Sequence, residues 1–311
     1  MKAIIVNEFG GTDQLHFVEM AIPVILADEV LIQVKAISIN PVDVKTRAGK
    51  GMAARMKEFK PLVLGWDISG VITAVGDDVK DFKKGDEVFG MVNFPGHGKA
   101  YAEYVAAPAN HLARKPTNIS HEQAAAATLA ALTAWEALTQ HAKVLRGQRV
   151  LIHAASGGVG HYAVQIAKHF GAYVIGTSSA ANRNFVMSLG ADEHIDYRAQ
   201  QLDHVIAPVD FVLDTVGGDT VENSLSLTNR GGTIISILGG KASSKAEEQK
   251  INCSSFLVQS NGSNMKQLAS LLEKNILKSH VTKIYPFASM ADAHAHVETG
   301  RTVGKVVVSL E

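Results

Sequence analysis

The chain has 311 residues, enough for two domains, and 46% of them are hydrophobic, which excludes a disordered composition. Basic and acidic residues number 30 each, so charge does not indicate nucleic acid or an anionic membrane as a main partner. The single cysteine, Cys253, excludes an intrachain disulfide and a cysteine-rich zinc site, and it fits a reducing compartment. Apolar runs are too short for a secretory signal or a membrane span, so we expect a cytoplasmic protein.

Residues 1 to about 115 have the character of a β domain. The segment 29–39 places Ile32, Val34 and Ala36 on one face of a strand. Residues 70–90 predict a strand, a polar turn and a second strand, and 100–108 predict a further strand that ends at Pro108. Short strands at this spacing favour a compact, barrel-like β domain.

From Ser120 onward the pattern becomes helical and then alternating. Ser120 and Gln123 have capping-box spacing, and an alanine-rich helix is predicted from there to about Gln140. Strands are predicted at 149–153, 172–177, 209–214 and 232–237, and helices at 159–170, 180–189 and 219–227. Residues 255–260, SFLVQS, have the pattern of a last strand. The spacing is that of βαβ units and indicates a doubly wound parallel sheet.

The C-terminal part changes character again. Helices are predicted at 265–275 and 289–300, the second ending at Gly300, and a strand at 304–310. A terminal strand of this kind can return to the first domain, which would leave the sheet domain inserted in the middle of the chain.

A glycine-rich loop joins the first strand of the alternating region to its first helix. Against Gly-x-Gly-x-x-Gly, the chain has Ala155, Gly157 and Gly160. The loop follows a strand and opens a helix, as a dinucleotide-binding loop requires, although a tight structural turn is the alternative. The bare backbone and the helix N-terminus would accept a pyrophosphate. The candidate cofactor contacts in this loop are Ser156, Gly157, Gly158, Val159 and Gly160.

The end of the next strand indicates which dinucleotide binds. An NAD site carries an acidic residue about 20 residues after the loop, and the segment from Thr177 to Phe185 contains none. It offers hydrogen-bond donors and one positive charge instead, which suit the 2′-phosphate of NADP(H). These donors are Ser178, Ser179, Asn182 and Arg183.

Several segments together resemble the medium-chain dehydrogenase/reductase superfamily, and more narrowly its zinc-independent quinone and enone reductases of the ζ-crystallin-like group. The resemblance covers nearly the whole chain in collinear order. It is carried by NPVDVKTRAG (40–49), DISGVITAVGDDVKDFKKGDEVFG (67–90), YAEYVAAP (101–108), LTAWEAL (132–138), HAASGGVG (153–160), GADEHIDYR (190–198), DTVGG (214–218) and GRTVGKVVV (300–308).

The resemblance implies a fold, a cofactor and an assembly. We expect a GroES-like catalytic domain at 1–118, completed by 274–311, and a Rossmann NADP(H)-binding domain at 119–273, with the nicotinamide held between them. The resemblance also implies a homodimer through the 255–260 edge strand. Tyr197 would lie beside the 2′-phosphate, Thr133 would approach the nicotinamide, and Val216 and Gly217 would contact the cofactor through their backbone.

The resemblance also bears on metal and on catalysis. Zinc-dependent relatives carry Cys where Asn40 stands and His-Glu where Trp66-Asp67 stands, so we expect no catalytic zinc. The segment 40–49 is read as a loop that lines the nicotinamide pocket. In it, Asn40 and Lys45 are the candidate donors to an enolate oxygen. Capping a turn and lying free in solvent are the structural alternatives for these two residues.

The activity indicated is NADPH-dependent reduction of quinones or α,β-unsaturated carbonyl compounds by hydride transfer. An enoyl-thioester reductase of the same superfamily stays open as an alternative. So does a cofactor-binding protein with a structural or RNA-binding role, although the balanced charge disfavours RNA as the main partner.

Overall fold

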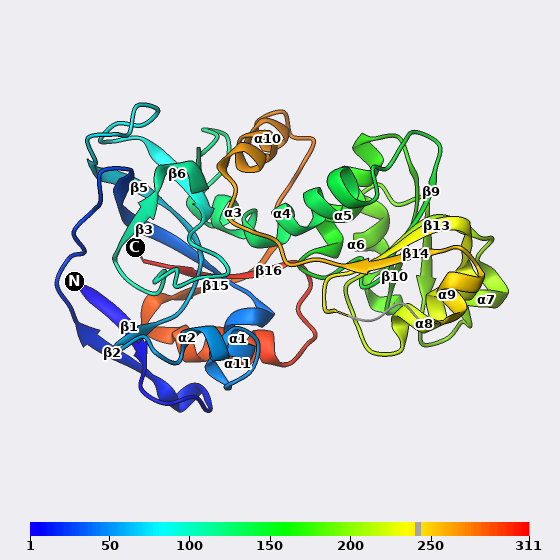
Figure 1. Cartoon of the computed structure of the whole chain (residues 1–311), viewed down its shortest axis with the longest axis horizontal. Helices are drawn as coiled ribbons and strands as arrows, with labels where there is room; N and C mark the ends of the chain where they lie inside the picture. Colours follow the sequence, from blue (N-terminus) through cyan, green and yellow to red (C-terminus); the bar gives the residue numbers. More distant parts are fainter. Residues whose placement is uncertain (240–243, 311) are drawn as a thin grey trace. The chain divides into compact units, whose positions relative to one another are not determined.

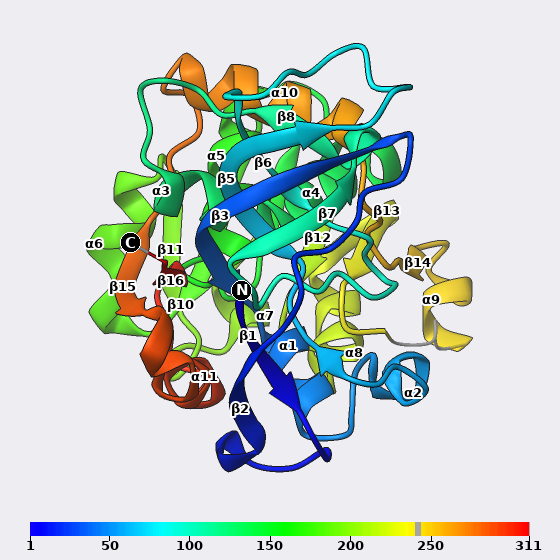
Figure 2. The same ribbon diagram turned by 90° about the vertical axis from the view of Figure 1, so that its left-hand side faces the viewer.

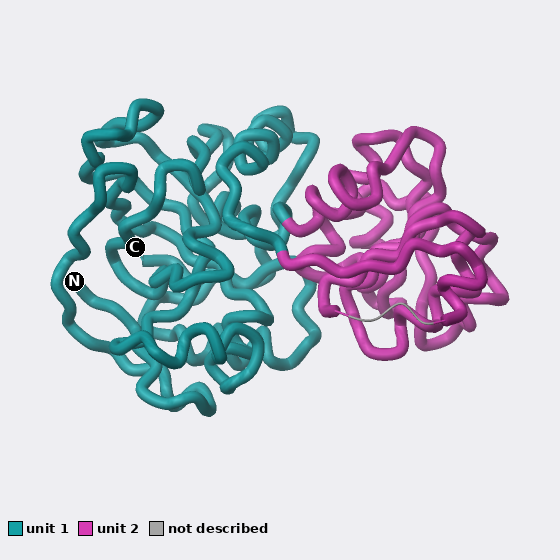
Figure 3. Tube along the Cα trace, viewed as in Figure 1, with its two compact units in different colours: residues 1–132, 258–311 teal, residues 133–257 magenta. Residues whose placement is uncertain are grey.

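The structure, a computed structural model, describes residues 1–239 and 244–310. The chain divides into two compact units (Figure 3). Unit 1 comprises residues 1–132 and 258–311, and unit 2 comprises residues 133–257. The chain therefore enters unit 2 from unit 1 and returns to it, as expected of an inserted sheet domain.

Unit 2 contains a six-stranded parallel sheet (Figure 1). Its strands, in spatial order, are β11 (Glu193–Asp196), β10 (Tyr173–Ser178), β9 (Arg149–Ile152), β12 (Val209–Asp214), β13 (Thr228–Ser236) and β14 (Asn252–Ser255). The order runs outward from β9 in both directions, which is the doubly wound arrangement, and it confirms the predicted Rossmann fold. The sequence analysis did not predict the short strand β11.

Short helices connect these strands. They are α5 (Gly160–His169), α6 (Arg183–Ser188), α7 (Leu202–Val205), α8 (Thr220–Ser224) and α9 (Ser244–Glu248). Right-handed crossovers place α5 and α6 on one face of the sheet and α8 and α9 on the other. The sheet core is aliphatic because parallel strands are covered on both faces, and Leu151, Ile175, Val212 and Ile234 are among its fully buried members.

The predicted edge strand at 255–260 is wrong. The last strand of the sheet is β14, and residues 256–260 have no regular structure. The segment 255–260 has more apolar residues, but pairing with β13 starts at Asn252, which lies opposite Thr233. Leu257, inside the predicted strand, is 43% exposed.

Unit 1 is built mainly from antiparallel strands. Its strands are β1 (Lys2–Val6), β2 (Leu15–Glu19), β3 (Glu29–Ile39), β4 (Leu62–Val63), β5 (Asp67–Val75), β6 (Glu87–Met91), β7 (Tyr104–Pro108), β8 (Leu112–Arg114), β15 (Val281–Pro286) and β16 (Lys305–Ser309). The long strand β3 pairs with β5, β7 and β16, and Figure 2 shows β7 alongside it. Strand β16 returns to this sheet, so the predicted return of the C-terminus is confirmed.

The helices of unit 1 differ from those predicted in several places, one of which is a short helix at Ala53–Met56 that the sequence does not predict. They are α1 (Pro41–Arg47), α2 (Ala53–Met56), α3 (His121–Ala126), α4 (Leu129–Glu136), α10 (Gly262–Glu273) and α11 (Met290–Glu298), and α4 crosses into unit 2. The segment 40–49 was read as a loop, but it contains α1. The alanine-rich helix is interrupted between α3 and α4, although its Ser120–Gln123 capping box is present.

The division into units also differs from the expected domain boundaries at 118 and 273. Helices α3 and α10, expected in the Rossmann domain, belong to unit 1. The reason for α3 is packing, because Ala125 and Ala126 are buried against Ala36 of β3 and Val307 of β16. Within the described part of the chain, no helix has the length and apolarity needed to cross a membrane.

Candidate functional site

The glycine loop has the bare backbone that the sequence predicts. Gly157 donates its N–H to the carbonyl of Ala154 at 2.8 Å, and α5 begins at Gly160. A Cβ at Gly160 would lie 2.2 Å from the Ala154 oxygen, so only glycine allows the helix to start so close to the strand. The loop and the helix N-terminus therefore fit a pyrophosphate. Its oxygens would accept hydrogen bonds from free backbone N–H groups, and its negative charge would interact favourably with the helix dipole.

The donors at the end of β10 lie beside this loop. Asn182 Nδ2 donates to Ser156 Oγ at 3.2 Å, which brings together two segments predicted separately as cofactor contacts. Ser178 is buried, Ser179 is half-buried, and Arg183 is exposed at the start of α6. The residues of β10 and of the turn after it offer donors and positive charge and no carboxylate, although Asp196 of β11 lies opposite Ser178. This composition suits a phosphate monoester better than two ribose hydroxyls.

Tyr197 follows β11 and is 53% exposed. Arg198 Nε donates to its hydroxyl at 3.2 Å, and the guanidinium lies 5.6 Å from the ring centroid. Arg198 was missed by the sequence analysis, although it is the next residue in the motif that singled out Tyr197. Arg198 thus places a guanidinium after β11, as Arg183 does after β10.

The loop after β12 was expected to contact the cofactor through its backbone, but its N–H groups are already hydrogen-bonded. The N–H groups of Val216 and Gly217 donate to Asp214 Oδ1 at 2.9 and 3.0 Å. They are therefore not free to donate to a cofactor, and a contact there would involve carbonyl groups or the exposed Val216 side chain.

Asn40 precedes α1 and takes part in a buried cluster in unit 1. Its side-chain Nδ2 donates to Asp67 Oδ2 at 2.8 Å, and its Oδ1 accepts from Lys305 Nζ. Its backbone N–H donates to Asp43 Oδ2 at 2.7 Å. We call Asn40, Asp43, Asp67 and Lys305 the Asn40 cluster. Because both ends of the amide are engaged, Asn40 holds the cluster together and is not placed as a free donor.

Burial dominates the protonation of the Asn40 cluster. Burial, reinforced by the charge of Asp67, raises the pKa of Asp43 from 3.8 to about 7. The pKa of Asp67 is also raised by burial, and that of Lys305 is lowered by burial, although each ion favours the charged form of the other. The Asp67 carboxylate also accepts the backbone N–H of Leu129 at 3.2 Å, so the cluster ties the start of α4 to the starts of α1 and β5.

A second buried group lies on the same helix. It is Arg47, which lies four residues after Asp43 but does not pair with it. Its Nη2 contacts Glu298 at 3.0 Å, and its Nε donates to the Gly10 carbonyl at 3.2 Å. Asp43 instead interacts with buried Tyr101, whose pKa is raised well above 10 by burial and then by the Asp43 charge and hydrogen bond.

Lys45 and Thr133 occupy different environments. Lys45 is exposed on α1, and its ammonium has no hydrogen-bond or ion-pair partner within residues 1–239 and 244–310. Of the two candidate donors in unit 1, Asn40 and Lys45, Lys45 is the one whose side chain makes no polar contact with the described residues. Thr133 is 5% exposed on α4.

Comparisons with known proteins identify the family. Residues 26–117 match the alcohol dehydrogenase GroES-like domain, and residues 189–308 match the family described as zinc-binding dehydrogenase. The chain is 36% identical to 2-methylene-furan-3-one reductase of Solanum lycopersicum, over 99% of this chain and 79% of that protein. NADPH-dependent alkenal/one oxidoreductase, chloroplastic, of Arabidopsis thaliana has the same identity and coverage. The quinone oxidoreductase of Coxiella burnetii superposes with a TM-score of 0.94 at 37% identity, covering 100% of this chain and 99% of that one.

The chain belongs to the medium-chain dehydrogenase/reductase superfamily, in the quinone oxidoreductase group. The GroES-like and Rossmann assignments made from the sequence are thereby confirmed.

The family description names zinc, but the side chains of this chain do not fit it. At the positions where zinc-dependent relatives carry Cys and His-Glu, this chain has Asn40 and Trp66-Asp67. Asn40 is not a zinc ligand, and its oxygen already accepts from Lys305. Trp66 is 1% exposed and donates its indole N–H to the Gly96 carbonyl at 2.6 Å. In the described residues, His, Cys, Asp and Glu form no group of three or more that could hold a metal ion.

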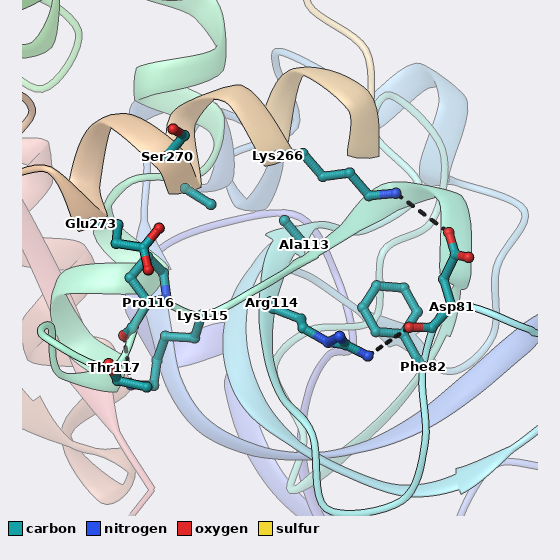
Figure 4. Close-up of a pocket in the computed structure, with 11 residues that line it drawn as sticks. Asp81, Phe82, Ala113, Arg114, Lys115, Pro116, Thr117, Lys266, Ser270 and Glu273 are labelled. Carbon is teal, nitrogen blue, oxygen red and sulfur yellow. Dashed lines mark hydrogen bonds and ion pairs between the residues drawn. The ribbon is translucent and has the colours of Figure 1, made fainter.

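A groove of about 630 Å³ elsewhere in unit 1 of this reductase homologue does not extend the site (Figure 4). It is lined by β8, α10 and the turn before β6, and none of the candidate residues lines it. Its basic side chains are paired: Lys266 with Asp81 at 3.4 Å, Arg114 with Asp86 at 2.8 Å, and Lys115 with Glu87 at 3.2 Å. The described residues therefore leave no unpaired positive charge there for an anionic ligand.

Proposed function

We propose that this chain is an oxidoreductase that uses NADPH to reduce quinones or α,β-unsaturated carbonyl compounds by hydride transfer, without zinc. The observation that carries the proposal is the segment after β10, whose own residues are donors without a carboxylate and whose Asn182 is joined to Ser156 of the glycine loop. Membership in the quinone oxidoreductase group supports it. So do the names of the two plant relatives, a furanone reductase and an alkenal/one oxidoreductase.

In this proposal, the loops that follow the strands of unit 2 bind the cofactor. The loop from Ser156 to Gly160 receives the pyrophosphate. Ser178, Ser179, Asn182, Arg183 and Tyr197 surround the 2′-phosphate, and Arg198 holds the Tyr197 hydroxyl in place. Thr133 approaches the nicotinamide, and the loop at Val216 and Gly217 contacts the cofactor without using its engaged N–H groups.

NADPH supplies the hydride when it is bound. Hydride addition to the β-carbon of an enone leaves negative charge on the carbonyl oxygen, and a preorganised donor stabilises that charge. We assign this donor role to Lys45, whose ammonium is free and exposed. Asn40 is assigned a positioning role instead, since its amide is held by Asp67 and Lys305. Water supplies the proton that completes the reduction.

The activity is tested by following NADPH oxidation with 1,4-benzoquinone, 9,10-phenanthrenequinone, short 2-alkenals and simple alcohols. We expect turnover of quinones and alkenals and none of alcohols. Lys45→Ala should lower kcat for alkenals by roughly 10²–10³, with a smaller effect on quinones, because a transition-state donor is lost. Lys50→Ala, which removes a neighbouring exposed lysine, is the matched control. Native rates for Lys45→Ala with both substrate classes would exclude the donor role.

The cofactor is tested by binding. Arg183→Ala and Tyr197→Phe should weaken NADPH and leave NADH unchanged, since only NADPH carries the 2′-phosphate. A lost charge-assisted hydrogen bond costs about 1.5–3 kcal/mol. Arg230→Ala, at an exposed arginine of β13 in the same unit, is the control. Equal affinity of the native protein for NADH and NADPH would overturn the NADP(H) assignment.

The assembly and location are also proposals. We propose a homodimer that pairs through the exposed edge of β14, in place of the segment 255–260. Ser254→Pro should then convert the dimer to a monomer in light scattering, because proline removes a backbone donor from the edge. The single cysteine supports a reducing compartment such as the cytoplasm, which cell fractionation would test.

A further inference from the structure

A buried histidine lies directly behind one of the proposed phosphate donors. His194 belongs to β11, where it pairs with Gly176 of β10, and it is 8% exposed. Its Nε2 lies 2.8 Å from the hydroxyl oxygen of Ser178. The two residues come from neighbouring parallel strands, so the contact is fixed by the sheet register.

A second hydrogen bond of Ser178 is compatible with His194 as the donor in this contact. The Ser178 hydroxyl donates its one hydrogen to the carbonyl of Ser179 at 3.1 Å. When it does so, its oxygen can accept from His194 in the tautomer that carries the hydrogen on Nε2. In this arrangement the hydroxyl hydrogen can turn from the Ser179 carbonyl to a phosphate oxygen while the bond from His194 persists.

Two charged groups face His194. Arg183 at the start of α6 disfavours the imidazolium, and Asp196 on β11 favours it. The nearest part of β10 contributes Thr177 and Ser178, which do not titrate. Burial, more than Arg183, lowers the pKa of His194, so the imidazole is neutral near pH 7 until a further negative charge arrives.

We propose that His194 is a specificity-determining residue for NADP(H): it holds Ser178 as a donor to the 2′-phosphate and takes up a proton from solvent when that phosphate binds. The inference rests on the proposed NADP(H) site. It goes beyond that site because it makes cofactor discrimination depend on pH. Discrimination against NADH should increase as the pH falls toward the range in which His194 protonates.

Three variants separate the two parts of the role. His194→Leu removes both the donor and the charge. His194→Gln keeps an N–H donor and cannot take up a proton. His204→Gln, at an exposed histidine of α7 in the same unit, is the control. Dissociation constants for NADPH and NADH are measured by fluorescence between pH 6.5 and 8.5, above the second phosphate pKa of about 6. Calorimetry in two buffers of different ionisation enthalpy counts the protons taken up.

We expect His194→Leu to weaken NADPH about tenfold at pH 7, which corresponds to roughly 1.4 kcal/mol, and to leave NADH unchanged. His194→Gln should bind NADPH like the native protein at pH 8.5 and lose the native tightening toward pH 6.5. Unchanged NADPH binding by His194→Leu, or an identical pH dependence in His194→Gln, would overturn the inference while leaving the cofactor assignment standing. A native protein that does not distinguish NADPH from NADH would overturn the cofactor assignment itself. Native-like NADH binding shows in every case that the variant is folded.

Discussion

Replacing Asp43 by asparagine should stabilise the protein increasingly as the pH rises. Asp43 is fully buried, and one of its oxygens accepts the Asn40 N–H at 2.7 Å. Asparagine can accept the same hydrogen bond, so the variant keeps the start of α1 and removes only the ionisable group. Its amide adds a donor near the Tyr101 hydroxyl, and any effect of that donor is the same at every pH in the range tested.

The magnitude follows from the shift in the Asp43 pKa. The folded state keeps a proton between pH 3.8 and about 7 that the unfolded state has already released. Raising the pH through this window therefore destabilises the folded state, by about 1.4 kcal/mol per pH unit for one proton. From pH 5 to 7, the free energy of unfolding of the native protein should fall by about 2–3 kcal/mol relative to Asp43→Asn.

Tryptophan fluorescence can isolate the unit that contains Asp43. The chain has two tryptophans: Trp66 is buried in unit 1, and Trp135 belongs to unit 2. In a Trp135→Phe background, urea unfolding followed at Trp66 reports on unit 1 at pH 5, 6, 7 and 8. Asp77→Asn, at an exposed aspartate of the same unit, is the control and should follow the native protein at every pH. A constant difference between Asp43→Asn and the native protein across this range would refute the reasoning, because Asp43 would then be ionised throughout.

Three further predictions concern the loop, the cluster and metal. Gly160→Ala should lower the Tm and abolish NADPH binding, because its Cβ would lie 2.2 Å from the Ala154 oxygen. Gly157→Ala, whose Cβ would have its nearest protein atom at 3.2 Å, should fold normally and lose only cofactor affinity. Lys305→Met should destabilise unit 1 by about 3–5 kcal/mol in urea unfolding, since Asp67 loses its buried counter-charge. Adding Asp67→Asn to this variant should restore most of the lost stability. If the effects of the two substitutions on the free energy of unfolding simply add, the two charges do not stabilise each other. NADPH oxidation should be unchanged after dialysis against EDTA, and a loss that zinc reverses would show that the metal assignment is wrong.

The Rossmann sheet could be predicted because each of its inner strands is a short aliphatic run in the sequence, separated from the next by a helical segment. Strand β14 could not, because its residues, Asn252–Ser255, are polar and pair only on account of the neighbouring β13. Helix α1 was missed although its signals were present. Asn40 before Pro41, with Asp43 three residues after Asn40, is a typical helix start, and the proline was read instead as part of a loop.

The Asn40 cluster could not be predicted because its members are separated by up to 265 positions in the sequence. Sheet register brings them together: Ser38 lies opposite Asp67 in the β3–β5 pair, and Ile39 lies opposite Val306 in the β3–β16 pair. A shift of one residue in either pair would turn Asp67 or Lys305 to the other face of the sheet. The charges of this cluster are therefore fixed by the fold and satisfy one another. Lys45, on the exposed side of α1, keeps a charge without a partner among the described residues, which is why we propose it as the donor to the substrate.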